Sequence, residues 1–212
     1  MNSKLLPRHL LLVMAMFYLA PSPAQTQTDK PRDNITVTAQ RLVTDEQSVM
    51  KVNASGFAAA SPQQVWQVLT DYERFPEFLP KLSSSRVISR SSSEVLVEQN
   101  GKAGFLFIKH NIHLLVRIIE QPFAAIDLTL VRGDMKHYVA RWELSPLARN
   151  GRNGTLITYA ATLEPDFFVP PLIGRPLVEA DVKETMEAVI AEIGRRVDGP
   201  ASQRKPVEKS VP

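Results

Sequence analysis

Hydrophobic and polar residues alternate with a period of two through the middle of the chain. The alternating runs cover residues 86–90, 94–100, 104–120, 124–132, 135–145 and 155–164, and the turn residues between them include Asn100-Gly101, Gly133-Asp134 and Asn153-Gly154. Short alternating runs separated by such turns are typical of antiparallel strands. The pattern predicts an antiparallel meander.

The longest run indicates which face of this sheet is buried and which is exposed to solvent. One set of alternate residues is apolar apart from a histidine and comprises Leu106, Ile108, His110, Ile112, Leu114, Val116 and Ile118, whereas the other set contains Lys109, Asn111, His113 and Arg117. Successive side chains of a strand point to opposite faces, so one face of the sheet is expected to be buried.

Before the meander, two β-prone runs and a helix are predicted. The runs "ITVTAQRLV" and "SVMKVNASGFAAA" flank residues 44–47 and indicate a hairpin. Ser61, Pro62 and Gln64 then form the start signal of a helix, with an S-x-x-Q capping box. Its apolar face comprises Val65, Trp66, Val68, Leu69 and Tyr72. We expect the helix to end in the low 70s, because Pro76 and Pro80 disfavour helical backbone before them.

The last periodic segment predicts a long amphipathic helix. Its apolar stripe comprises Val182, Met186, Val189, Ile190, Ile193 and Val197, at spacings typical of one helix face. Gly174 and Pro176 are expected to delay the regular helix until about Leu177. The predicted fold class is therefore α+β, with a curved antiparallel sheet wrapped around a long C-terminal helix.

The N-terminal residues have the features of a secretory signal peptide. A basic start with Lys4 and Arg8 precedes an apolar run over residues 10–20, which is too short to span a membrane, and Ser22 and Ala24 suit a cleavage site. We expect cleavage of residues 1–24 and a periplasmic or secreted mature protein that begins at Gln25. Residues 25–33 are expected to be a linker, 34–197 the folded domain and 198–212 a disordered tail.

The amino-acid composition restricts the class of protein to which this chain can belong. The chain has no cysteine, so a single core must stabilise it without disulfides. It has 25 Lys and Arg against 22 Asp and Glu, and removal of Lys4 and Arg8 leaves a balance of +1. This balance excludes a typical nucleic-acid binder. The oligomeric state is not specified by the sequence.

Three segments carry a resemblance to a known superfamily. They are "SPQQVWQVLTDYERFPEFLP", "LVRGDMKHYVARWEL" and "EPDFFVPPLIGRPLVEADV". Over roughly residues 35–197 the chain resembles the START-like superfamily, also called helix-grip or polyketide cyclase/dehydrase-like proteins. The resemblance implies two short helices after the N-terminal strands, and a cavity between the sheet and the long helix. The superfamily spans lipid carriers, coenzyme Q-binding proteins, aromatase/cyclases, hormone receptors and ribosome-interacting toxins.

The resemblance gives the aromatic segments an expected role. It implies that Phe75 and Phe78, with Phe167 and Phe168, form an apolar rim around the cavity mouth, although Phe167 and Phe168 could equally pack under the start of the long helix. Trp66 and Tyr72 are expected in the core. "FPEFLPKL" lacks the tryptophan-cysteine pair of the coenzyme Q-binding branch, so ubiquinone is an open candidate only.

The sequence contains no motif for cofactor, metal or covalent chemistry. No nucleophile pair, phosphate loop or metal-ligand spacing is present, and the spacing of His110 and His113 puts them on opposite strand faces. His110 could touch a ligand's polar head or act as a general base, but a neutral histidine bonded in the core is favoured. Tyr138, Trp142 and Tyr159 either line the cavity or pack on the final helix.

These observations predict an exported, non-enzymatic protein that binds a lipid, quinone or other apolar small molecule, with transient membrane contact. The alternatives are an aromatase/cyclase-like enzyme that uses His110 and a tyrosine as acid and base, and a protein-interaction module without a small ligand. The predicted ligand contacts are Phe75, Phe78, Ile108, His110, Ile112, Leu128, Leu130, Tyr138, Trp142, Tyr159, Phe168 and Met186.

Overall fold

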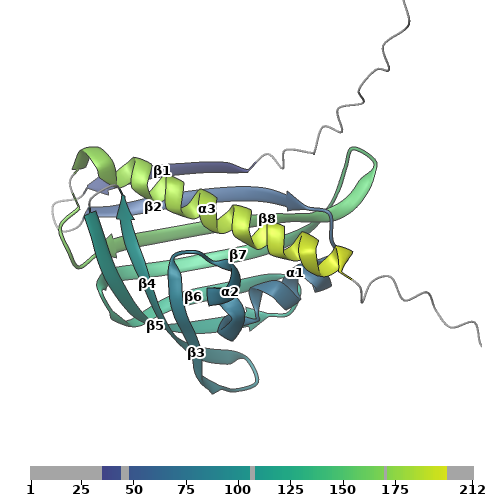
Figure 1. Cartoon of the computed structure of the whole chain (residues 1–212), viewed down its shortest axis with the longest axis horizontal. Helices are drawn as coiled ribbons and strands as arrows, with labels where there is room; N and C mark the ends of the chain where they lie inside the picture. Colours follow the sequence, from purple (N-terminus) through teal and green to yellow (C-terminus); the bar gives the residue numbers. More distant parts are fainter. Residues whose placement is uncertain (1–34, 44–47, 106–107, 170, 200–212) are drawn as a thin grey trace, which may run out of the picture. The chain divides into compact units, whose positions relative to one another are not determined.

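The computed structural model describes residues 35–43, 48–105, 108–169 and 171–199, and the predicted signal peptide and linker lie outside them. The elements in chain order are β1 (Thr36–Val43), β2 (Ser48–Ala58), α1 (Pro62–Leu69), the 3-10 helix η1 (Tyr72–Arg74), α2 (Phe75–Phe78), β3 (Leu82–Arg90), β4 (Glu94–Phe105), β5 (Ile108–Gln121), β6 (Ala125–Gly133), β7 (Met135–Arg149), β8 (Arg152–Pro165) and α3 (Pro171–Asp198). Figure 1 shows α3 crossing the sheet. The predicted α+β helix-grip fold is confirmed.

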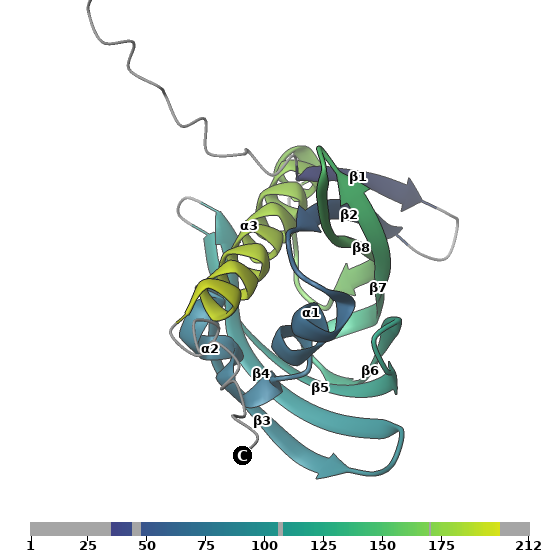
Figure 2. The ribbon, with the colours of Figure 1, turned by 90° about the vertical axis from the view of Figure 1, so that its right-hand side faces the viewer.

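The eight strands form one antiparallel sheet in the order β1-β2-β8-β7-β6-β5-β4-β3. Strands β3 to β8 make the predicted meander, and the β1–β2 hairpin joins it at β8, where Met50 pairs with Leu163. Figure 2 shows the sheet curving around α1 and α3, so its concave face is the one that these helices cover.

The predicted turn at Asn100-Gly101 is wrong, because both residues lie inside β4 and pair with β5. Glycine is needed there for close packing of backbone. A Cβ atom at position 101 would lie 2.7 Å from the Lys81 carbonyl oxygen. That carbonyl also accepts a hydrogen bond of 2.8 Å from the Lys102 N–H. Gly101 therefore brings Lys81, and the segment that precedes β3, against the end of β4.

The predicted turn at Asn153-Gly154 is also wrong, because the β7–β8 hairpin turns at Asn150-Gly151. Both turn residues have positive φ, 50° and 74°, as a two-residue Asn-Gly turn requires. Asn153 and Gly154 pair with β7 inside β8. This hairpin region contains the Asn-Gly dipeptide twice, at 150–151 and 153–154, and the first copy makes the turn. The turn predicted at Gly133-Asp134 is confirmed, since it joins β6 to β7.

Helix α1 begins as predicted. The Ser61 N–H donates to Gln64 Oε1 (2.9 Å), and the Gln64 N–H donates to Ser61 Oγ (3.3 Å), which completes the capping box. Helix α3, however, begins at Pro171 rather than near Leu177. Pro176 removes only one intrahelical bond near the helix start. Glu179 stabilises that turn, because it accepts a hydrogen bond from Arg175 (3.1 Å) and another from the Ala39 N–H of β1 (2.9 Å).

The core lies between the concave face and the second half of α3. Val116 and Ile118 of β5 are fully buried, which confirms the predicted inward face. Met186, Val189 and Ile193 bury the predicted stripe of α3 in the same cluster. Within the described part of the chain, no helix has the length and apolar character needed to cross a bilayer.

The C-terminal end of α3 is fixed to α1 by charged side chains. Glu192 is 7% exposed and accepts hydrogen bonds from Arg195 (2.6 Å) and Arg196 (2.7 Å). Arg196 also lies 2.9 Å from Asp71, just after α1. The hydrogen bond from Arg195 is the main cause that lowers the pKa of Glu192 to about 2, and Arg196 contributes in the same direction.

Candidate ligand cavity

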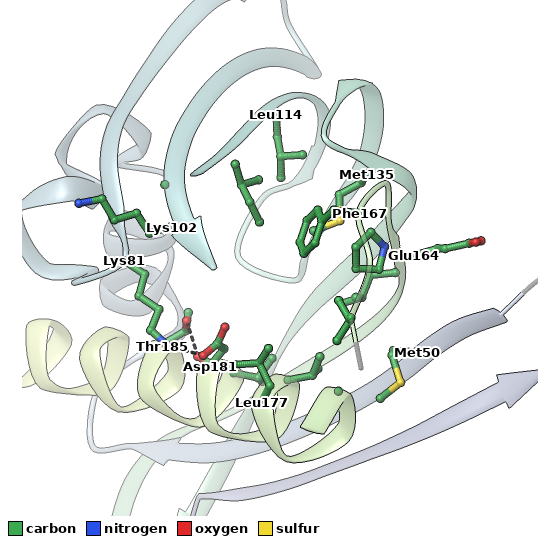
Figure 3. A pocket seen from close by; sticks show the side chains of 18 of the residues that line it. Met50, Lys81, Lys102, Leu114, Met135, Glu164, Phe167, Leu177, Asp181 and Thr185 are labelled. Atoms are coloured by element: carbon green, nitrogen blue, oxygen red, sulfur yellow. Dashed lines mark hydrogen bonds and ion pairs between the residues drawn. The ribbon is translucent and has the colours of Figure 1, made fainter. Parts of the chain in front are cut away.

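A cavity of about 680 Å³ lies between the first half of α3 and the sheet. Figure 3 shows side chains converging on it from the strands, from α3 and from the loop before α3. Its apolar lining includes Met50, Leu79, Leu82, Ile112, Leu114, Met135, Leu163, Leu177, Val178 and Val182. Because apolar side chains make up most of this lining, the cavity suits an apolar guest.

The cavity exists because α3 packs tightly along only half of its length. The fully buried residues of its stripe, Met186, Val189 and Ile193, all belong to the second half. In the first half, Leu177, Val178 and Val182 line the cavity and remain only partly buried. Leu79, Pro80 and Lys81, from the segment after α2, complete the wall.

One wall of the cavity carries a charged cluster. Lys81 forms an ion pair with Asp181 and another with Glu184, the latter at 3.1 Å from Nζ to Oε2. Thr185 also lines the cavity, and its hydroxyl donates to the Asp181 carbonyl oxygen (2.9 Å). Burial raises the pKa of Asp181, and Lys81 opposes that shift. Burial lowers the pKa of Lys81, but the hydrogen bonds to both carboxylates outweigh this and raise it.

The cavity mouth combines exposed apolar residues with cations. Phe168 is 82% exposed and lines the cavity. The alternative prediction, that Phe168 packs under the start of the long helix, is therefore wrong. Val43 is 70% exposed and pairs with Ser48, another lining residue. The cationic residues that line the cavity besides Lys81 are Arg41, Lys102, Lys136 and Arg175. The lining therefore combines apolar residues with these cations and with the acidic residues Glu164 and Asp166.

His110 is not a buried core residue, so that interpretation is wrong. It is exposed and stacks on Phe167, with ring centroids 4.1 Å apart. Phe167 itself lines the cavity, which places His110 behind the mouth loop. His110 lies near the start of β5, where it pairs with Ala103 of β4. Of the other predicted contacts on β5, Ile112 lines the cavity, and the side chain of Ile108 lies outside the described ones.

Phe75 and Phe78 do not join the other two phenylalanines in a rim. Their rings pack edge to face, 5.7 Å apart, and Phe75 packs on Tyr72 in the same way at 5.6 Å. All three lie against the buried core. The single turn of α2 directs the two rings inward and leaves Leu79 and Pro80 at the cavity.

The remaining predicted contacts lie outside the cavity lining. They are Leu128, Leu130, Tyr138, Trp142, Tyr159 and Met186. The rings of Trp142 and Tyr159 are 4.6 Å apart, and the hydroxyls of Tyr138 and Tyr159 are 3.3 Å apart. Burial raises the pKa of both phenols. The three aromatic residues thus pack in or against the core, and direct ligand contact by them stays a prediction.

Sequence reasoning missed the polar cluster and most of the α3 wall. Lys81 and Asp181 are far apart in the chain, and only the fold brings them together. The available signal was weak: Asp181, Glu184 and Thr185 flank the apolar stripe of the final helix. Among residues 35–43, 48–105, 108–169 and 171–199, no group of His, Asp or Glu side chains is arranged to hold a metal ion.

An eight-stranded antiparallel sheet that grips a long helix, with an apolar cavity between them, defines the START-like helix-grip class. The chain belongs to the polyketide cyclase / dehydrase and lipid transport family, whose model matches residues 58–190. A weaker sequence match is to the ribosome association toxin RatA of Rickettsia prowazekii, 25% identical over 85 residues. That match covers 40% of this chain and 58% of the toxin.

Solved structures share this fold at low sequence identity. A START superfamily protein from Mycobacterium smegmatis has a TM-score of 0.59 and 16% identity, and covers 69% of this chain and 98% of its own. The Zhui aromatase/cyclase from a Streptomyces species has a TM-score of 0.58 and 16% identity, with coverages of 71% and 97%. A STAR-related lipid transfer protein from Xanthomonas axonopodis has a TM-score of 0.54 and 15% identity, with coverages of 74% and 99%. At these identities the likeness shows the fold alone.

Proposed function

We propose that the domain binds one apolar molecule of the lipid class in the cavity and shields it from water, without chemical conversion. The observation that carries this proposal is the cavity itself, about 680 Å³ with a largely aliphatic lining. Its size falls in the range that encloses a small organic ligand. Burial of apolar surface, at about 25 cal/mol per Å², supplies the driving force.

The positions of the titratable groups favour binding over catalysis. The tyrosines that could act as acid or base lie outside the cavity lining, and His110 stacks behind Phe167. Lys81, which does reach the cavity, is held in an ion-pair cluster. No observation in the described residues favours a protein-interaction module over a small-molecule carrier.

The direct test is the chemical content of the protein. The natively expressed protein is purified, denatured and extracted with organic solvent, and the extract is analysed by mass spectrometry. We expect one molecule per chain of a single lipid class, or an empty cavity that takes up one molecule of the neutral dye Nile red. A protein that holds no molecule and binds no dye would contradict the proposal.

The exposed mouth suggests that ligand passes through it from a membrane. We expect Phe168→Asp to change the free energy of unfolding by less than about 0.5 kcal/mol, because the side chain is largely exposed. The same variant should slow the transfer of a fluorescent lipid from vesicles. Leu147→Asp is the matched control, since Leu147 is an exposed apolar residue near the opposite end of β7. Equal transfer rates in the two variants would contradict a role for the mouth.

We further propose that this binding takes place after export, in the periplasm or outside the cell. The proposal rests on the N-terminal sequence features, since residues 1–24 lie outside the described structure. We expect the intact mass of the native protein to correspond to a chain that begins at Gln25. A mass that retains Met1 would contradict export with cleavage.

A further inference from the structure

The charged cluster on the cavity wall has more negative than positive charge. Lys81 comes from the segment between α2 and β3, and Asp181 and Glu184 come from the first half of α3. With one ammonium and two carboxylates, the cluster has a net charge of −1 at neutral pH. Figure 3 shows Lys81 and Asp181 joined beside the cavity.

The same cluster has more free acceptors than donors. The ammonium of Lys81 has three N–H groups, and the two carboxylates take two of them. Each carboxylate has a second oxygen, and among the described residues no donor is bonded to it. A ligand group that donates a hydrogen bond therefore finds several acceptors here, whereas a group that only accepts finds at most one N–H.

The other cations that line the cavity bond to other groups or point away from this cluster. Arg41 on β1 donates a hydrogen bond to Ser48 Oγ (2.8 Å). Arg175 is paired with Glu179, and Lys136 lies 4.0 Å from Asp166. Lys102 on β4 also lines the cavity, but Figure 3 shows its ammonium directed away from Asp181. Glu164 also lines the cavity, but Figure 3 shows its carboxylate directed away from it. An anionic head group placed beside Asp181 would thus meet like charge in a partly desolvated site.

We infer that this cluster selects ligands whose polar end donates a hydrogen bond, an alcohol or an amine, over ligands that end in a carboxylate or phosphate. This inference rests on the proposed ligand-binding function and specifies the class of ligand. The aliphatic lining contacts the hydrocarbon chain of the ligand. Asp181 and Glu184 accept hydrogen bonds from its polar head group. Discrimination comes from the repulsion of an anion rather than from a tighter fit.

The test uses three ligands with the same chain and different ends: dodecanol, dodecylamine and dodecanoate. Each displaces Nile red from the purified protein at neutral pH. We expect the concentration that displaces half of the Nile red to be about tenfold higher for dodecanoate than for dodecanol. A factor of this size is expected for repulsion by one partly screened charge. In Asp181→Asn/Glu184→Gln the cluster charge becomes +1, and dodecanoate should become the best of the three. Glu187→Gln, an exposed change on the same helix, should leave the order unchanged.

The outcomes separate this inference from the function on which it rests. If Nile red binds and the three ligands displace it equally, or dodecanoate is the best, the head-group inference is wrong and cavity binding stands. If the protein binds neither the dye nor any of the three ligands, the proposed function fails. If the double variant does not unfold cooperatively in urea, it is not properly folded, and the single variant Glu184→Gln is used to test the head-group preference instead. It makes the cluster neutral and should remove the preference.

Discussion

Replacing Leu114 with arginine should abolish the binding of Nile red, with affinity falling by roughly a hundredfold or more. Leu114 lies on the inward face of β5 and its side chain forms part of the apolar wall of the cavity (Figure 3). An unpaired guanidinium there keeps water in the cavity and removes apolar area. We also expect the free energy of unfolding to fall by about 2 to 4 kcal/mol, because Leu114 packs against the core.

The matched control is Ile119→Arg, which places the same charge on the exposed face of the same strand. It should change neither affinity nor stability appreciably. Leu177→Arg, from the α3 wall, separates lost binding from lost folding, because Leu177 does not belong to the residues packed against the core cluster. If Leu177→Arg is stable and still binds the dye with unchanged affinity, the cavity is not the binding site.

Glu192→Gln should lower the free energy of unfolding by about 2 kcal/mol at neutral pH, after allowance for the solvent exposure of Arg195. The pKa of Glu192 is about 2 in the folded protein, below its ordinary value of 4.5. A lowered folded-state pKa gives stability that is present above pH 4.5. This stability is lost as the pH falls from about 4.5 to about 2 and Glu192 becomes protonated.

Urea denaturation of the wild type and the variant across this pH range measures the effect. The difference between the two proteins should be largest above pH 5 and should vanish near pH 2, where protonated glutamate resembles glutamine. Glu187→Gln, at an exposed position of α3, should show no such difference. A Glu192→Gln effect that does not change with pH would mean that packing, rather than the ion pairs with Arg195 and Arg196, is responsible.

The elements of the fold were predictable from local patterns. The period of two in β5, the capping box at Ser61 and the stripe around Met186 each report a buried face through nearby residues. Where local signals compete, prediction failed. Two Asn-Gly dipeptides, at 150–151 and 153–154, offered the same turn, and only the pairing of β7 with β8 decides between them. The helix start at Pro171 depends in part on a contact of Glu179 with β1, which no local pattern contains.

The candidate site was less predictable, because it depends on where apolar residues fail to pack. Val182 and Met186 have equivalent places in the stripe of α3, yet the first lines the cavity and the second lies in the core. Nothing in the sequence distinguishes them. Lys81 and Asp181 likewise meet only through the fold, since Gly101 lets the Lys81 backbone approach the end of β4.

The pairing of β2 with β8 also determines the stage of folding at which the cavity can first form. Met50 and Leu163 are partners across these two strands and both line the cavity, but they come from opposite ends of the folded domain. The α3 wall comes later still in the chain. Such non-local contacts form slowly compared with hairpins and helices. A nascent or partly folded chain therefore has no cavity, and the proposed ligand can bind only after the last part of the domain has folded.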